Sequence, residues 1–157
     1  MPIIELTTSI NAGIGICFDL SRSIDLHKIS TAHTNEKAID GITAGLIGLN
    51  EFVTWQAKHF GITQKLTAKI TRYDRPYHFR DEQIKGAFKS FTHDHYFIQN
   101  DTGVIMKDVF DFRSPYGLLG VVFNGLVLTR YMKKFLTKRN EIIKAYAENG
   151  KGKSLIL

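Results

Sequence analysis

The sequence predicts an α+β protein in which a curved antiparallel sheet of about seven strands wraps around one long C-terminal helix. Two observations favour this fold class. Between residues 37 and 113, short segments of strand-like alternation follow one another with only brief turns between them, which is typical of an antiparallel meander. From residue 118 the apolar residues take a helical spacing instead. A curved sheet can cover the apolar face of such a helix, and it leaves a cavity between them.

The N-terminal part is expected to contain one strand, residues 2–10, and two short helices after it. Asn11 is expected to cap the first helix and Ser23 the second, because both side chains can accept a hydrogen bond from a free backbone N–H. Further strands are expected at 37–42, 51–60, 62–73, 77–84, 88–99 and 104–113. The glycine-containing segment 43–50 between them can be a mobile lid over a pocket or a simple turn of the chain.

The C-terminal part is expected to form a helix over residues 118–148, with Gly125 as a possible bend. The last residues, GKGKSLIL, are expected to fray. A chain of 157 residues suits one domain with a real core. We therefore expect a single domain at residues 1–148 and a frayed tail at 149–157.

Composition narrows the class of protein. Cys17 is the one cysteine, so no intramolecular disulfide can form and a reducing compartment is expected. The start, MPIIELTTSIN, lacks the pattern of a signal peptide. The longest apolar stretch, 118–128, is too short to span a bilayer. The expectation is a cytoplasmic protein with no stable membrane insertion.

The basic balance of the chain does not indicate a nucleic-acid partner. The formal net charge is +6, which permits weak attraction to anionic partners. However, no run of Lys and Arg interleaved with aromatic residues marks a nucleic-acid stripe. We interpret the charge as a solvated basic surface, and the sequence leaves the oligomeric state open.

The stretch FTHDHYF, residues 91–97, places two histidines on one face of an expected strand. Alternate residues of a strand share a face. His93 and His95 therefore point inward together with the flanking phenylalanines. Asp94 points outward, where we expect it at the surface.

The next hairpin supplies an acidic partner for these histidines. If Asp101 and Thr102 form its tip, His95 lies directly opposite Asp108. Opposed Cβ atoms in such a pair are about 4.5–5.5 Å apart, so a His95–Asp108 hydrogen bond is expected. A one-residue bulge would break this register.

The same alternation predicts an inner wall that is mostly aromatic with a few polar groups, which is the usual composition of a small-molecule site. Its expected ligand-binding residues are Trp55, His59, Phe79, Asp81, Gln83, Phe91, His93, His95, Phe97, Met106, Asp108, Phe110 and Phe112.

Three stretches carry a resemblance to a known family: INAGIGICFDLSRSIDLH (10–27), FRDEQIKGAFKSFTHDHYF (79–97) and GVIMKDVFDFRSPYGLLG (103–120). The sequence resembles the SRPBCC superfamily of START and birch-pollen-allergen proteins, and within it uncharacterised bacterial ligand-binding members. The resemblance covers about residues 1–148. It departs at Gly13, Ala87 and Val104, where the family usually has proline, proline and threonine. It implies the helix-grip fold and a hydrophobic-ligand cavity, but no single activity.

Three functions remain open at this point. Binding or carriage of a small hydrophobic ligand, such as a lipid or polyketide, needs the fewest assumptions. The alternative is a polyketide cyclase-like enzyme, catalysing cyclisation, dehydration or isomerisation with His95 and Asp108 as an acid–base pair beside His93. A metal site of the same three residues is not favoured, because no second motif supports it. No cofactor is expected.

Overall fold

The computed structural model describes residues 2–115, 117 and 124–157 and confirms the predicted α+β class. All strands belong to one antiparallel sheet with the order β1-β7-β6-β5-β4-β3-β2. The strands are β1 (Ile3–Ile10), β2 (Lys37–Gly41), β3 (Phe52–His59), β4 (Ile62–Asp74), β5 (His78–Gly86), β6 (Ser90–Asn100) and β7 (Gly103–Arg113). The α-helices are α1 (Ile14–Ser21), α2 (Ile24–Ser30) and α4 (Thr129–Asn149). Two short 3₁₀-helices, η1 (Ala32–Thr34) and η3 (Lys151–Leu155), and one π-helix, η2 (Asn124–Leu128), accompany them.

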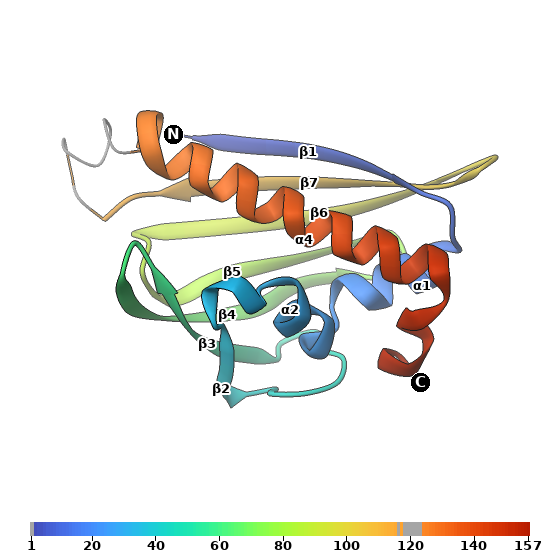
Figure 1. The fold of residues 1–157 in the computed structure, drawn as a ribbon, viewed down its shortest axis with the longest axis horizontal. Coiled ribbons are helices and arrows are strands. Elements are labelled where there is room, and N and C mark those ends of the chain that lie inside the picture. The colour runs from blue at the N-terminus through green and yellow to red at the C-terminus, as the bar shows by residue number, and fades with distance from the viewer. Residues whose placement is uncertain (1, 116, 118–123) are drawn as a thin grey trace.

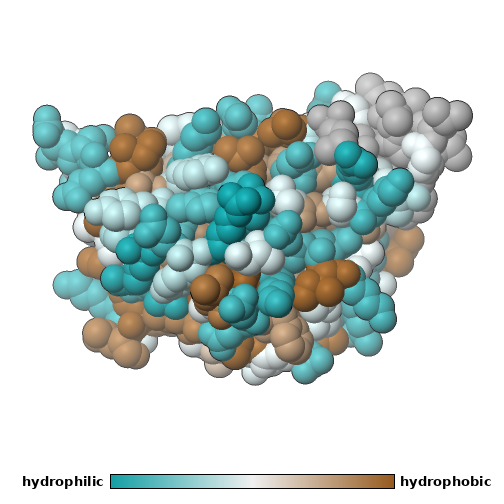
Figure 2. Space-filling view, turned by 180° about the vertical axis from the view of Figure 1, so that it is seen from behind, coloured by the Kyte–Doolittle hydropathy of each residue, from teal (hydrophilic) through white to brown (hydrophobic). Residues whose placement is uncertain are grey.

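The helices lie together on one face of the sheet. Figure 1 shows α4 crossing the sheet diagonally, with α1 and α2 beside it on the same face. The opposite face of the sheet carries no helix among the residues described, and there Figure 2 shows separate hydrophobic patches among hydrophilic side chains. None of the helices in the described part of the chain is long and apolar enough to cross a membrane.

The hairpin of β6 and β7 has the register predicted from the sequence. Asn100 pairs with Gly103, and the ladder continues without a break to Ser90 and Arg113. The β4–β5 pair is less regular, with register shifts between Thr67 and Ala68 and again after Ile70. Such bulges bend a sheet locally, which helps this one curve around α4.

The core is divided into two clusters. One lies under α1, where Phe18 is fully buried and makes edge contacts with Tyr73, Phe79 and Phe97 at centroid distances of 5.3–5.4 Å. The other lies at the opposite end of the strands, beneath the first half of α4, and is built from residues such as Ile4, Phe91, Phe110, Phe112, Met132 and Leu136. The division leaves room for a cavity between sheet and helix.

The first helix begins differently from the prediction. Gly13 occupies the cap position of α1 in an extended conformation, and no described side chain caps the helix. The expected Asn11 cap is therefore wrong, because the chain bends at residues 11 and 12 and the helix begins only at Ile14. The backbone N–H of Asn11 donates instead to Glu148 Oε2 at 2.9 Å. The Ser23 cap is confirmed, since its Oγ accepts a 3.1 Å hydrogen bond from the Leu26 amide.

The C-terminal helix also differs from the expectation. The α-helical part begins at Thr129 and follows η2, a π-helix that contains Gly125. Positions 118–123 of the predicted helix lie outside the described residues.

The tail is folded back rather than frayed. Gly150 ends α4 in the left-handed region, with φ of 79°, as is common at helix ends. Residues 151–155 then form η3, and Gly152 is buried so close to Leu20 that a Cβ there would lie 2.7 Å from its methyl carbons.

Replacing Gly103 with alanine should destabilise the fold by about 1–3 kcal/mol. Its φ is 151°, and a Cβ would lie 2.2 Å from the Ile10 carbonyl oxygen where β1 meets β7. Gly61→Ala is the matched control, because its φ is also positive at 76° but no atom lies within 4 Å of the added carbon. Urea unfolding midpoints measure both. An equal loss in the two variants would show that the close approach to β1 contributes nothing.

Candidate functional site

A cavity of about 400 Å³ lies between the sheet and α4, within the range of small-molecule pockets. At its rim lie the exposed side chains of Phe60, in the β3–β4 turn, and of Ile62, the first residue of β4. Apolar and aromatic residues dominate the part of the lining that the structure describes, among them Trp55, Ala57, Phe88, Phe91, Phe110, Leu128, Tyr131 and Phe135. Its polar lining includes His27, Glu36, His59, Asp81 and His93.

A second space of about 100 Å³ adjoins the first beneath α1 and α2. Both spaces are lined by Asp81 and His93, which therefore stand between them. The smaller one also touches Arg22 and Arg139. Asp81 and His93 thus lie on the side of the larger cavity that adjoins the smaller one, and we call this side the inner end of the larger cavity.

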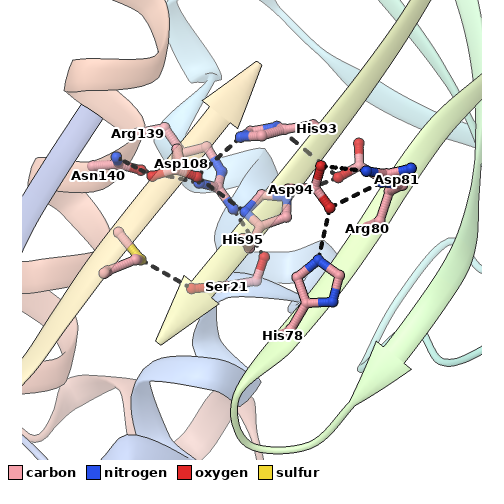
Figure 3. A network of polar contacts seen from close by, with 11 residues as sticks. Ser21, His78, Arg80, Asp81, His93, Asp94, His95, Asp108, Arg139 and Asn140 are labelled. Atoms are coloured by element: carbon pink, nitrogen blue, oxygen red, sulfur yellow. Dashed lines mark hydrogen bonds and ion pairs between the residues drawn. The ribbon is translucent and has the colours of Figure 1, made fainter. Parts of the chain in front are cut away.

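A polar cluster of two histidines and two carboxylates, from three neighbouring strands, lies at this inner end. Asp81 lies on β5, His93 and His95 on β6, and Asp108 on β7, and Figure 3 shows them converging. His93 Nε2 lies 2.9 Å from Asp108 Oδ1, and His95 Nε2 lies 2.7 Å from Asp81 Oδ1. The two imidazole rings are 3.8 Å apart between centroids.

The expected His95–Asp108 hydrogen bond is replaced by diagonal ones. The register is as predicted, and His95 Nδ1 lies 3.0 Å from Asp108 Oδ1. The direction of that contact does not suit a hydrogen bond, and Nδ1 has no other partner among the residues described. Strand twist brings diagonal neighbours together, so Asp108 bonds to His93 and His95 bonds to Asp81.

Asp108 also ties the sheet to α4. It is 1% exposed, and its Oδ2 accepts a 2.6 Å hydrogen bond from Asn140. Arg139 Nη1 lies 3.7 Å from Oδ1, and the guanidinium also donates to the Ser21 carbonyl at 3.0 Å. Asp108 is thus enclosed by two residues of α4 and the two histidines, and it does not line either cavity.

The charges within this cluster follow from opposing effects. Burial disfavours ionised Asp108, but the contacts with His93 and His95 outweigh it and hold its pKa well below the usual value. Burial likewise opposes protonated His95, yet Asp108 and Asp81 outweigh it and raise the His95 pKa. For His93, burial and the charge of His95 lower the pKa. The His95 pKa is thus raised and the His93 pKa lowered, so His95 holds its proton to a higher pH than His93 does.

The pKa of Asp81 is also lowered. Burial opposes its ionisation, but the hydrogen bond from His95 and the nearby charges outweigh that effect. Asp81 therefore presents a carboxylate to both cavities.

The predicted wall residues separate into two groups. Those that line at least one cavity are Trp55, His59, Phe79, Asp81, Phe91, His93, His95 and Phe110, and those that line neither are Gln83, Phe97, Met106, Asp108 and Phe112. Gln83 is used instead to close the β5–β6 turn, where its amide both donates to and accepts from the Phe88 backbone at 2.8 and 3.1 Å. Phe97 and Met106 are packed in the cluster under α1, and Phe112 is fully buried in the other cluster.

Strand alternation missed the wall residues that come from helices and from the strand edge. The ring of His27 in α2 lies tilted against Trp55, with 4.2 Å between the ring centroids, and bonds to Glu36 at 2.8 Å. Tyr131 of α4 hydrogen-bonds to His59. The helical spacing of Tyr131 and Phe135 was the available signal for α4, whereas nothing in the local pattern identifies Glu36.

Asp94 points outward as predicted but is not a surface residue. It is only 5% exposed, because His78 and Arg80 cover it on the outer face with contacts of 2.7–2.9 Å (Figure 3). Burial raises its pKa, but the hydrogen bonds from Arg80 and His78 outweigh burial and lower it. This outer cluster of one carboxylate, one histidine and one arginine lines neither of the two cavities described above.

A metal ion would be held by a different set from the one considered in the sequence. Asp81, His93 and His95 each offer a ligand atom, and these atoms lie within 4.8 Å of one another. Two imidazoles and a carboxylate suit a divalent ion such as zinc. Asp108 stands on the far side of both rings, where metal-binding histidines commonly meet an orienting carboxylate.

The segment 43–50 is fastened to the helices. The Ile24 amide donates to the Gly45 carbonyl at 2.9 Å, and the Gly45 amide donates to Asp25 at 2.9 Å. Ile47 is 5% exposed and lines the smaller cavity. Among the two interpretations of this segment, these contacts favour a fixed turn over a lid.

No protein-family model and no curated protein sequence matches the chain. Solved structures do match over nearly its whole length. The protein TTHA0849 from Thermus thermophilus aligns with a TM-score of 0.72 and 14% identity, covering 94% of this chain and 100% of that one. The chain has the helix-grip fold.

Two further neighbours of the helix-grip chain extend this comparison. Major latex-like protein 151 from Panax ginseng aligns with a TM-score of 0.69 and 14% identity, covering 93% of this chain and 97% of that one. Ara h 8.0201 aligns with a TM-score of 0.66 and 13% identity, with the same coverage. At such identities the likeness establishes the fold alone.

His93 should lose its proton below the ordinary histidine pKa, and His95 above it. The causes are burial at His93 and the flanking carboxylates at His95. NMR titration of the ring nitrogens measures both. Finding the imidazolium on His93 at neutral pH would contradict this arrangement.

The same shifts predict how stability depends on pH. A raised folded pKa at His95 stabilises fully below about pH 6.5, and this stabilisation is lost as pH rises through the folded pKa. His93 has the opposite sign, and its contribution is complete above about pH 6.5. Of the two histidines, only His95 therefore makes the free energy of unfolding fall as pH rises above about 6.5. Urea unfolding at a series of pH values from 6.5 upward would measure this fall.

Proposed function

We propose that the protein binds and carries a small hydrophobic ligand in the cavity between the sheet and α4. The observation that carries this proposal is a space of about 400 Å³ with a largely apolar and aromatic lining and a few polar groups, Asp81 and His93 among them. Such a lining removes apolar surface of a ligand from water, while the few polar groups orient it.

The division of the core supports this proposal. The cavity passes beside the cluster that contains Phe91, Phe110 and Leu136, so these side chains lack partner atoms on one side. A void in a core forfeits dispersion contacts, and a bound apolar molecule would restore them. The exposed Phe60 and Ile62 at the rim would cover the ligand's outer end.

The second candidate is an acid–base enzyme, such as a polyketide cyclase-like dehydratase or isomerase. It is favoured by one observation: His93 lines the cavity and is hydrogen-bonded to the buried carboxylate of Asp108. Burial and the charge of His95 lower the His93 pKa, which favours its neutral form. This is the arrangement of an oriented general base. His95 has both nitrogens against carboxylates, so in an enzyme His93 would act on the substrate and Asp108 would orient it.

Filling the cavity should abolish ligand binding without loss of fold. Ala57 is 6% exposed and lines the cavity. Ala57→Phe should therefore weaken binding of the neutral apolar dye N-phenyl-1-naphthylamine at least tenfold, measured by fluorescence. Lys58→Phe adds the same ring at the next, exposed position and should leave binding unchanged.

Native mass spectrometry of gently purified protein separates binding from turnover. A co-purified apolar molecule that is lost in Ala57→Phe supports the binding proposal. A bound molecule whose mass changes on incubation favours the enzyme instead. Equal dye binding by wild type and Ala57→Phe would reject the cavity as the binding site.

A further inference from the structure

We propose that the cavity selects a ligand whose head group donates hydrogen bonds, a protonated amine above all, and rejects a carboxylate of the same chain length. This inference deepens the proposed ligand binding and rests on it. It concerns the chemical class of the head group, which the apolar lining alone does not determine.

The lining of the larger cavity is acidic. Its ionisable residues in the described part of the chain include two carboxylic acids, Asp81 and Glu36, and three histidines, with no lysine or arginine. The chain as a whole has a net charge of +6. The interior of the cavity therefore has the opposite character from the protein's overall charge, and an apolar cation entering it meets acceptors.

Asp81 offers a free acceptor at the inner end. Its side chain is 23% exposed, against 7% or less for His93, His95 and Asp108. Its contacts with His95 and His93 all use Oδ1. Oδ2 takes part in no hydrogen bond with the residues described, so it remains available to a donor in the cavity.

Glu36 offers a second acceptor on another wall. Its Oε1 bonds to His27 at 2.8 Å, and no described residue bonds to Oε2. The charge of Glu36 opposes the burial effect on the pKa of His59 and adds to it in raising the pKa of Tyr131. Its field therefore reaches two groups that line the same cavity.

The two arginines near the site are not free to bind a carboxylate. Arg22 donates to Asp19 at 2.9 Å and to the Ile47 carbonyl at 3.1 Å. Arg139 donates to Asn140 and to the Ser21 carbonyl, both at 3.0 Å. Both line the smaller space and not the larger one.

A carboxylate head would therefore be desolvated beside Asp81 without an unpaired cation to offset the cost. Like charges at close range disfavour ionisation of both groups, and a buried ion needs a partner. An ammonium head is instead attracted to Asp81. Its Oδ2 can accept a hydrogen bond from the ammonium group in place of a water molecule that the ammonium group loses on entering the cavity. A hydroxyl head can donate to the same oxygen without a charge.

A series of probes with one chain and three head groups tests this. Decylamine, 1-decanol and decanoate would each displace N-phenyl-1-naphthylamine from the wild-type protein at pH 7, below their aggregation concentrations. The expected order of affinity is amine, alcohol, carboxylate, with at least a tenfold difference between the first and the last. Decanoate binding as tightly as decylamine would overturn the head-group proposal and leave ligand binding standing.

Two charge-removing variants locate the selectivity. Asp81→Asn and Glu36→Gln should each reduce the ratio of amine to carboxylate affinity at least threefold. Glu82→Gln removes the same charge from the neighbouring position on the other face of β5 and should leave the ratio unchanged.

The outcomes separate the two proposals. Displacement by none of the three probes would defeat the hydrophobic-ligand function itself. An unchanged ratio in both Asp81→Asn and Glu36→Gln would overturn the assignment of the acceptors. Glu36 lies outside the buried cluster of Asp81, His95 and Asp108, so its variant keeps the test decisive if Asp81→Asn fails to fold.

Discussion

The buried carboxylate of Asp108 is the constraint on which the rest of the site depends. It sits at 1% exposure on β7 and meets His93 and His95 from β6 and Asn140 from α4. Removal of one of these partners would leave the Asp108 carboxylate without full compensation in a low-dielectric interior, at a cost of about 3–5 kcal/mol. The helix must therefore cross the sheet at this point, and the position of α4 over the strands follows from it.

That crossing point also decides where the chain is dense and where it is hollow. On one side, Phe18 and its aromatic neighbours fill the space under α1. On the other side, the lining residues of the sheet and of α4 enclose a cavity of about 400 Å³. The polar cluster marks the boundary, which explains why Asp81 and His93 are the parts of it that face the cavity.

The fold class and the register of β6 and β7 could be predicted from the sequence. For the register this is because a hairpin with a defined tip determines which residues oppose one another. The pairing of His95 with Asp108 is such a case. The hydrogen bonds were beyond that reasoning, since strand twist makes diagonal partners closer and the choice of acceptor depends on a third strand, β5. The burial of Asp94 needed the same knowledge, because His78 and Arg80 cover it from β5. Asn11 is not the cap because the helix begins two residues later than expected, after Gly13. The backbone N–H of Asn11 is bonded to Glu148, near the other end of the chain, and no local pattern indicates that contact.

The contrast between cavity and overall charge bears on how such a protein can be interpreted. A net charge of +6 describes the chain as a whole. Salt largely screens the interactions of exposed charged side chains beyond about 10 Å. Asp81 and Glu36 act on a ligand at contact distance and out of bulk water, where a single charge counts for far more. The basic balance of the sequence therefore says little about the ligand. The charge preference of the cavity depends instead on two carboxylates, Asp81 on β5 and Glu36 directly before β2.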